Sequence, residues 1–186
     1  MMKYAGFWKR FVALWVDFFV LILPGLVFGM LESYSRTSAL LTLIPSSLLG
    51  FAYEIYFHGR WGQTIGKMSM RIRVVCLDGA LISWKQAFLR SSVGLGLAVL
   101  LLISNMVALL KISESEFSNL SWREINQLAP YVRQINFATT VWEWSEVIVM
   151  LFNRKRRALH DFIAGTVVID ASYQPSEQQP VDSDAI

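Results

Sequence analysis

The sequence FVALWVDFFVLILPGLVFGML, residues 11–31, is an apolar stretch with one formal charge, Asp17. Arg10 precedes the stretch by one position and Asp17 by seven, so both side chains project from roughly the same face of a helix. A lone carboxylate in hydrocarbon costs several kcal/mol unless it is paired, protonated or facing water. The stretch therefore predicts a membrane span whose charge must be sheltered by other helices or by water.

Composition supports an integral membrane protein. The chain has 186 residues, of which 54% are hydrophobic and 17% are charged, and its mean hydropathy is +0.43. Soluble domains carry about 25% charged residues. The length suits one small bundle without a separate soluble domain, and a single cysteine, Cys76, excludes an intramolecular disulfide. The first apolar stretch is too long for a signal peptide and carries Asp17, so we expect no cleaved leader.

Four segments are candidates for crossing the bilayer, which requires about 20 apolar residues in a helix. They cover residues 11–31, 38–57, 88–110 and 134–152. The last is the weakest because it contains Glu143 and Glu146. The predicted fold is an all-α membrane bundle of about four transmembrane helices with a small cytoplasmic β-hairpin or sheet.

The distribution of basic residues predicts the orientation. Most of the 17 Lys and Arg residues lie before the first span, in the connector 58–90 or after residue 152. Because cytoplasmic loops are enriched in Lys and Arg, both termini and this connector are expected in the cytoplasm. An even number of spans is needed for that arrangement, which favours counting the fourth segment.

The connectors predict further structure. The run RIRVVCLDGALISW, residues 71–84, has two short apolar segments around Asp78-Gly79, a strong hairpin signal. The run 166–170 is a third β-type segment, expected to join the hairpin. The external connector 111–136 predicts a short helix lying on the outer surface. Residues 1–170 are expected to form one transmembrane domain, and residues 171–186 a disordered polar cytoplasmic tail.

The acids within or near spans are Asp17, Glu54, Glu143 and Glu146. One interpretation is a polar pathway for a cation or a proton. The other is a structural ion pair, such as Asp17 with Arg10 or with a basic residue of another segment. Glu54 lies close enough to the cytoplasmic end to reach lipid headgroups. The two remaining glutamates either line a cavity or indicate that the fourth span starts later.

The basic cluster after the fourth segment predicts contact with anionic lipid headgroups. Its members are Arg154, Lys155, Arg156 and Arg157. His160 and Asp161 follow, but the only other histidine is isolated in sequence, which disfavours a metal site. No Ser-His-Asp arrangement, P-loop or dinucleotide motif is evident. We therefore expect no catalytic residue, no metal, no cofactor and no enzyme activity.

Three ordered motifs carry a family resemblance. They are AGFWKRFVALWVD at residues 5–17, GQTIGK at 62–67 followed by RIRVV and Asp78-Gly79, and RALHD at 157–161 followed by AGTVV. Together they resemble the RDD family of bacterial membrane proteins, named for an arginine and two aspartates. The resemblance implies that Arg10 and Asp17 are the arginine and first aspartate, and Asp161 the second. The acidic fourth segment and the long connector before it depart from the family pattern.

The resemblance implies a multi-pass protein of the bacterial inner membrane and a role in transport, with some members linked to sodium–proton exchange. Arg10 and Asp161 should lie at similar depth, with Asp17 about 10 Å deeper. We expect an Arg10-centred cluster that ties the first span to the C-terminal segment.

Three functions remain open. The first is a transporter or transporter subunit, with Asp17 as a proton-cycling carboxylate. The second is a non-catalytic scaffold or assembly factor that binds a partner through its cytoplasmic face. The third is a membrane enzyme using His160 and Asp161. Expected partners are the bilayer, anionic headgroups and either a membrane protein or a second copy, through Gly94 and Gly96; no nucleic acid is expected.

Overall fold

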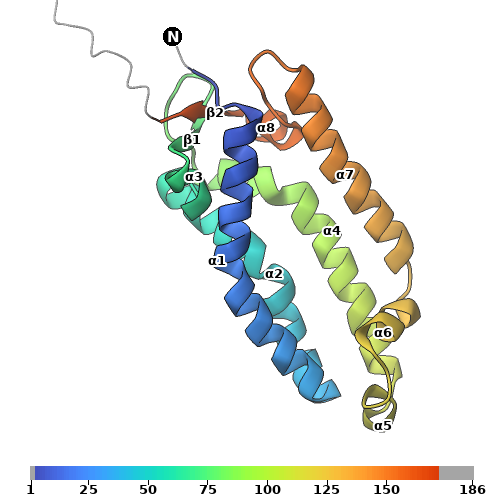
Figure 1. Cartoon of the computed structure of the whole chain (residues 1–186). Coiled ribbons are helices and arrows are strands. Elements are labelled where there is room, and N and C mark those ends of the chain that lie inside the picture. The colour runs from blue at the N-terminus through green and yellow to red at the C-terminus, as the bar shows by residue number, and fades with distance from the viewer. Residues whose placement is uncertain (1–2, 172–186) are drawn as a thin grey trace, which may run out of the picture.

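The computed structural model describes residues 3–171, and four long helices dominate it (Figure 1). They are α1 (Phe7–Tyr34), α2 (Arg36–Trp61), α4 (Trp84–Lys111) and α7 (Val132–Phe152). Each of the four apolar segments is therefore confirmed as a helix, extended beyond its predicted limits at one or both ends. The expected tail lies outside the described residues except for Ala171.

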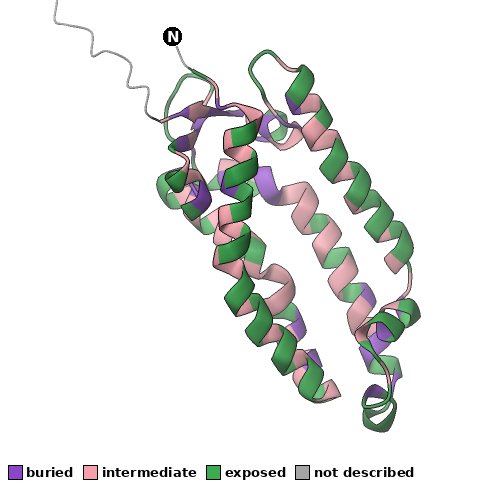
Figure 2. Cartoon of the chain, in the orientation of Figure 1, coloured by how far each residue is buried: buried purple, intermediate pink, exposed green. Residues whose placement is uncertain are grey.

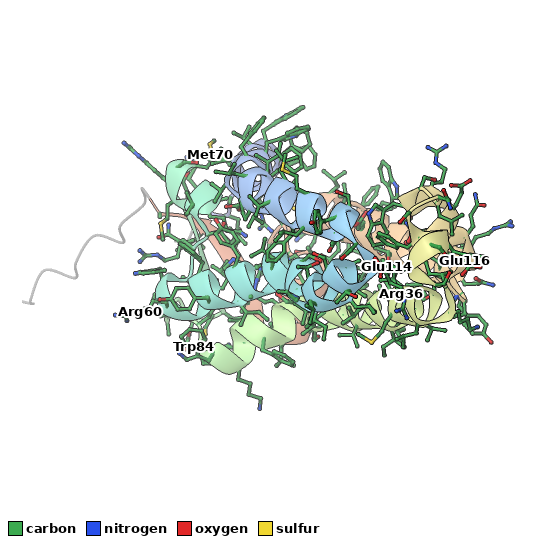
Figure 3. All side chains as sticks on the ribbon, turned by 90° about the horizontal axis from the view of Figure 1, so that it is seen from below. Arg36, Arg60, Met70, Trp84, Glu114 and Glu116 are labelled. Atoms are coloured by element: carbon green, nitrogen blue, oxygen red, sulfur yellow. The ribbon has the colours of Figure 1, made fainter. Side chains whose placement is uncertain are left out.

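The short elements gather at the two ends of the bundle (Figure 1). The sheet end carries α3 (Ile65–Ser69), β1 (Ile72–Cys76), α8 (Leu159–Ala164) and β2 (Thr166–Asp170). The loop end carries α5 (Glu114–Phe117) and α6 (Trp122–Leu128). Figure 3 shows Arg60, Met70 and Trp84 at the first end, and Arg36 with Glu114 at the other.

Within residues 3–171, three helices are long and apolar enough to cross a membrane: α1, α2 and α4. The expected fourth span, α7, has 21 residues but is not among them. The acids Glu143 and Glu146, together with several polar neighbours, lower its hydropathy. The prediction of a helix at residues 134–152 is thus confirmed, while the count of four spans is not shown.

The sheet has two strands and differs from the predicted hairpin. β1 pairs antiparallel with β2, with Val74 opposite Val168. The expected second hairpin strand is wrong, because only one bridge, Val75 to Leu81, forms on that side. The turn itself does form: Gly79 has φ +91°, and the Asp78 carboxylate accepts a hydrogen bond from Ala80 N.

Buried residues concentrate at the two ends rather than along the middle of the helices (Figure 2). At the sheet end, the core includes Ala13, Ile72, Val74 and Val168. Along α1, large apolar side chains such as Leu14, Phe19 and Leu23 remain exposed. Long helices with an apolar exterior are what a lipid environment requires.

The loop end corrects another expectation. Instead of one surface helix, the connector forms two short helices, each started by a capping box, with Ser113 capping α5 and Ser121 capping α6. Phe117 and Ile125 are buried against the ends of α2 and α4, whereas Leu128 is exposed. The connector is thus folded onto the bundle.

Gly94 is used inside the chain rather than on a free helix face. A Cβ at Gly94 would lie 3.2 Å from the Phe51 ring of α2, whereas a Cβ at Gly96 would meet nothing within 4 Å. The close approach at Gly94 therefore serves the packing of α4 on α2.

Candidate functional site: a charged cavity at the sheet end

Asp161 is fully buried and forms the centre of an ion cluster that joins three parts of the chain. Its Oδ2 lies 3.2 Å from Arg10 Nη1 of α1, and its Oδ1 accepts a hydrogen bond from Arg90 Nη1 of α4. Thr166, the first residue of β2, donates to Asp161 Oδ1 over 3.1 Å and accepts from Arg90 over 2.6 Å. The cluster therefore ties the N-terminal helix to the C-terminal segment.

The position of Asp161 in the chain fixes its side chain before those partners are added. It is the third residue of α8, and its Oδ2 accepts from Ala158 N over 3.1 Å at the start of that helix. Burial alone would raise the pKa of Asp161. Arg90, His160 and Arg10, together with the Ala158 N–H, outweigh burial and hold the pKa below the ordinary aspartate value.

Arg90 is one of two charged cavity residues that the sequence motifs do not single out. It is 6% exposed and bonds to Asp161, Thr166 and His160 Nε2. In the sequence it is the last basic residue of the connector 58–90. The available signal was its place inside a helical segment that leads directly into an apolar run, where an arginine needs a buried partner.

Asp17 is held by a different set of groups. Its Oδ1 accepts from Tyr53 Oη over 2.6 Å and from Gly66 N over 2.7 Å, and its Oδ2 accepts from Thr64 Oγ1 over 2.6 Å. Tyr53 belongs to α2, while Thr64 and Gly66 lie at the start of α3. Asp17 therefore fastens α3 against α1 and α2.

Gly66 allows that close approach. A Cβ at this position would lie 1.9 Å from Ala13 O of α1 and 2.8 Å from the Asp17 carboxyl carbon. Only a residue without a side chain lets the α3 backbone reach the carboxylate. The expectation that Asp17 would pair with Arg10 is not met: Arg10 bonds to Asp161, and Asp17 accepts from uncharged donors.

The remaining predicted acids occupy three different environments. Glu146 Oε2 lies 2.6 Å from His160 Nδ1, and its Oε1 accepts from His160 N over 3.0 Å. Glu54 lies 3.6 Å from His58 and accepts from Ser91 over 3.3 Å. Glu143 is exposed and makes no hydrogen bond or ion pair with residues 3–171.

The basic cluster divides in two. Arg154, Lys155 and Arg156 are exposed, as contact with headgroups would require. Arg157 does not belong with them: it donates to Thr166 O over 3.0 Å and to Asp161 O over 2.8 Å, and it stacks over the Phe162 ring. Its predicted role as a headgroup anchor is therefore replaced by a structural tie between α8 and β2.

A cavity of about 370 Å³, here called the α1–α7 cavity, brings most of these groups together. Its walls include Phe11 and Leu14 of α1 and Val147 and Met150 of α7. Its charged and histidine side chains are Arg10, Asp17, Glu54, Lys67, Arg90, Glu146 and His160. Arg10 and Asp17 thus share a surface although they bond to different partners.

Lys67 enters the cavity from α3 and was not singled out by the sequence. Burial lowers its pKa; Glu54 and Asp17 act in the opposite direction, whereas Arg90 and Arg10 lower it further. Within residues 3–171, no hydrogen bond or ion pair involves its side chain.

A second pocket, of about 310 Å³, lies toward the loop end and is here called the loop-end pocket. It is lined by Gly25 and Glu32 of α1, Ser46 and Ser47 of α2, and Asn105 of α4. Ser46 donates to Glu32, and the buried Asn105 Oδ1 has no hydrogen-bond partner in the described part of the chain.

Comparison with known proteins gives one match. The model of the RDD family matches residues 4–165, which is most of the chain. No curated protein and no solved structure matches.

Proposed function

Because this chain belongs to the RDD family, we propose that it is a transport-related membrane protein in which α1, α2, α4 and α7 cross the bilayer. In this proposal the α1–α7 cavity receives a solute from the sheet end. The supporting observation is that ionisable side chains from α1, α2, α3, α4, α7 and α8 converge on this one cavity. Ionisable groups at membrane depth commonly mark substrate pathways.

The proposed orientation places the sheet end in the cytoplasm of a bacterial cell, with the protein in the inner membrane. The support is the concentration of basic residues at that end, including the exposed Arg154, Lys155 and Arg156. Both termini would then be cytoplasmic, and α7 would be the fourth span.

The spacing of the two cavities supports a path through the protein. On α1, Leu21 lines the α1–α7 cavity and Gly25 lines the loop-end pocket. On α2, Gly50 lines the first and Ser47 the second. These separations are four residues on α1 and three on α2, about 6 Å and about 4.5 Å, so roughly one turn separates the two spaces. A constriction this short can be opened by small helix movements, as alternating access requires.

Cation–proton exchange is one reaction that such a path could carry. The sequence pointed to Asp17 as its proton carrier, but both Asp17 oxygens are occupied by donors of the chain. Glu54 is the better candidate, because it lines the same cavity and its side chain is 38% exposed. The scaffold function remains a separate prediction, tested by cross-linking a specific partner at residues 70–85.

The path predicts two-sided access at Gly50. In a Cys76→Ser background, a Gly50→Cys variant should react with a membrane-impermeant thiol reagent from both faces of sealed vesicles, because the constriction opens alternately. A Cβ at this position meets nothing within 4 Å, so the variant should fold. The measurement is labelling in vesicles of both orientations, in sodium, potassium and choline buffers.

Gly96→Cys is the matched control, since a Cβ there also meets open space and Gly96 lines neither cavity. It should react from neither face because it is surrounded by lipid. Labelling of Gly50→Cys from the sheet-end face alone, in every buffer, would contradict a path.

A further inference from the structure

We propose that the α1–α7 cavity binds the phosphate group of an anionic lipid, with Lys67, Arg10 and Arg90 as its donors. The inference rests on the proposed function, because it names the class of solute that the cavity admits. It differs from general attraction of headgroups to Arg154, Lys155 and Arg156, which lie outside the cavity lining.

The first argument is that the cavity has unused donors. Arg10 Nε, Arg10 Nη2 and Arg90 Nε are buried without a hydrogen-bond partner among residues 3–171. The Lys67 side chain also has no hydrogen bond or ion pair within that range. The buried arginine donors cost free energy unless a ligand or water satisfies them. Three cations with free donors on one cavity form a site for an oxyanion, since Arg and Lys both bind phosphate well.

The second argument is that each acid of the cavity already has at least one partner in the chain, although Glu54 stays 38% exposed. Asp17 accepts three hydrogen bonds from the chain, and Glu146 accepts from His160 N and lies 2.6 Å from its ring. Glu54 accepts from Ser91 and faces His58. Of the buried atoms of the cavity lining that lack a hydrogen bond among residues 3–171, three are arginine donors, and the single acceptor, Glu146 Oε2, already lies 2.6 Å from His160 Nδ1. Because the unpartnered buried atoms of the cavity are mainly hydrogen-bond donors, the cavity favours an anion over a cation.

The third argument concerns the walls. Phe7, Phe11 and Leu14 line one side of the cavity, and Val147 and Met150 line the other. Phe11 is 42% exposed and Leu14 is 65% exposed, so this wall continues to the outer surface of α1. In a bilayer that surface faces hydrocarbon. A free phosphate would gain nothing from such walls, but the apolar tail of a lipid would leave through this side while its phosphate stayed at Lys67.

The volume is compatible with this occupant. At about 370 Å³, the cavity falls in the range of about 300–1,000 Å³ that is common for small-molecule sites. It can hold a headgroup and the first part of a tail, with the rest of the tail lying along α1.

The test uses the purified full chain in a nonionic detergent. Binding is measured by calorimetry for three probes: dioctanoyl phosphatidic acid, dioctanoylglycerol and inorganic phosphate. The first two differ only in the phosphate. Each is compared between wild type, Lys67→Gln, Lys67→Arg and Lys85→Gln, the last being a control at an exposed lysine of α4 outside the cavity.

We expect phosphatidic acid to bind at least tenfold more tightly than dioctanoylglycerol. Lys67→Gln should remove most of that ratio, while Lys67→Arg and Lys85→Gln should keep it. Equal binding of the two lipids, or an unchanged ratio in Lys67→Gln, would overturn the site. Inorganic phosphate that binds as tightly as phosphatidic acid would overturn the assignment to a lipid.

The outcome is separable from that of the transport proposal. Two-sided labelling of Gly50→Cys without selectivity for phosphatidic acid would support the transport path and overturn the lipid site. Selectivity for phosphatidic acid with labelling of Gly50→Cys from one face alone would support the lipid site and overturn the transport path.

Discussion

Replacing Asp161 with asparagine should lower the free energy of unfolding by about 3–5 kcal/mol, since it leaves buried arginines without their counter-charge. Asp161 is fully buried, Arg90 is 6% exposed, and both Arg90 and Arg10 bond directly to this carboxylate. The amide can replace one acceptor but not the charge. The measurement is thermal unfolding of the purified protein in detergent, where the midpoint should fall by roughly 10 °C.

Asp78→Asn is the matched control, because Asp78 is exposed in the turn after β1 and asparagine can keep its bond to Ala80 N. Its midpoint should stay within about 2 °C of wild type.

Since the pKa of Asp161 is lowered in the folded state, its contribution to stability is present above the unfolded pKa of about 3.9 and is lost as the pH falls below it. The difference between wild type and Asp161→Asn should therefore shrink below about pH 4. Equal midpoints for Asp161→Asn and Asp78→Asn at pH 7 would contradict the structural role of the ion cluster.

Gly66→Ala should lower the free energy of unfolding nearly as much as Asp161→Asn does. The added Cβ would lie 1.9 Å from the Ala13 carbonyl oxygen, a backbone atom that cannot rotate away. Overpacking of this kind costs about 1–3 kcal/mol. Separating α3 from α1 also weakens the hydrogen bonds from Gly66 N and Thr64 to Asp17, and bonds to a charged group contribute about 1.5–3 kcal/mol each. We expect a total loss of about 3 kcal/mol, measured by the same thermal unfolding.

Gly96→Ala provides the comparison. It also replaces a glycine with alanine, but on α4, where a Cβ meets nothing within 4 Å. Alanine in a helix interior is favoured over glycine by about 0.5–1 kcal/mol, so this variant should be neutral or slightly more stable. If Gly66→Ala were as stable as Gly96→Ala, the contact between α3 and α1 would not be the tight one described here.

The helices could be predicted from sequence because hydropathy is a local signal. All four apolar segments are helical, and the pairing of 166–170 with 72–76 agrees with the expected sheet. The hairpin partner could not be predicted reliably. The turn at Asp78 and Gly79 is local and forms as expected. The hydrogen-bonded partner of β1, however, is β2, which lies almost 100 positions later in the chain.

The site could be predicted only in part, because it depends on which helix faces which. Equal depth was enough to place Arg10 near Asp161. Depth along the helices did not predict that Arg90 would pair with Asp161 of α8. It also did not predict that Lys67 of α3 would line the cavity. The spacing of Arg10 and Asp17 predicts one helix face for both, and both line the cavity. The spacing could not show that the backbone of Gly66 approaches Asp17.

The central claim is that α7 crosses the membrane, so that α1 and α7 enclose a charged cavity within the bilayer. It is tested most directly by side-specific labelling of single cysteines in a Cys76→Ser background, at Asp78, Ser118 and Lys155, which are all exposed. Cysteines at 78 and 155 should react from one face of sealed vesicles, and a cysteine at 118 from the other. Reaction of 118 and 155 from the same face would show that α7 does not cross, and would contradict the account.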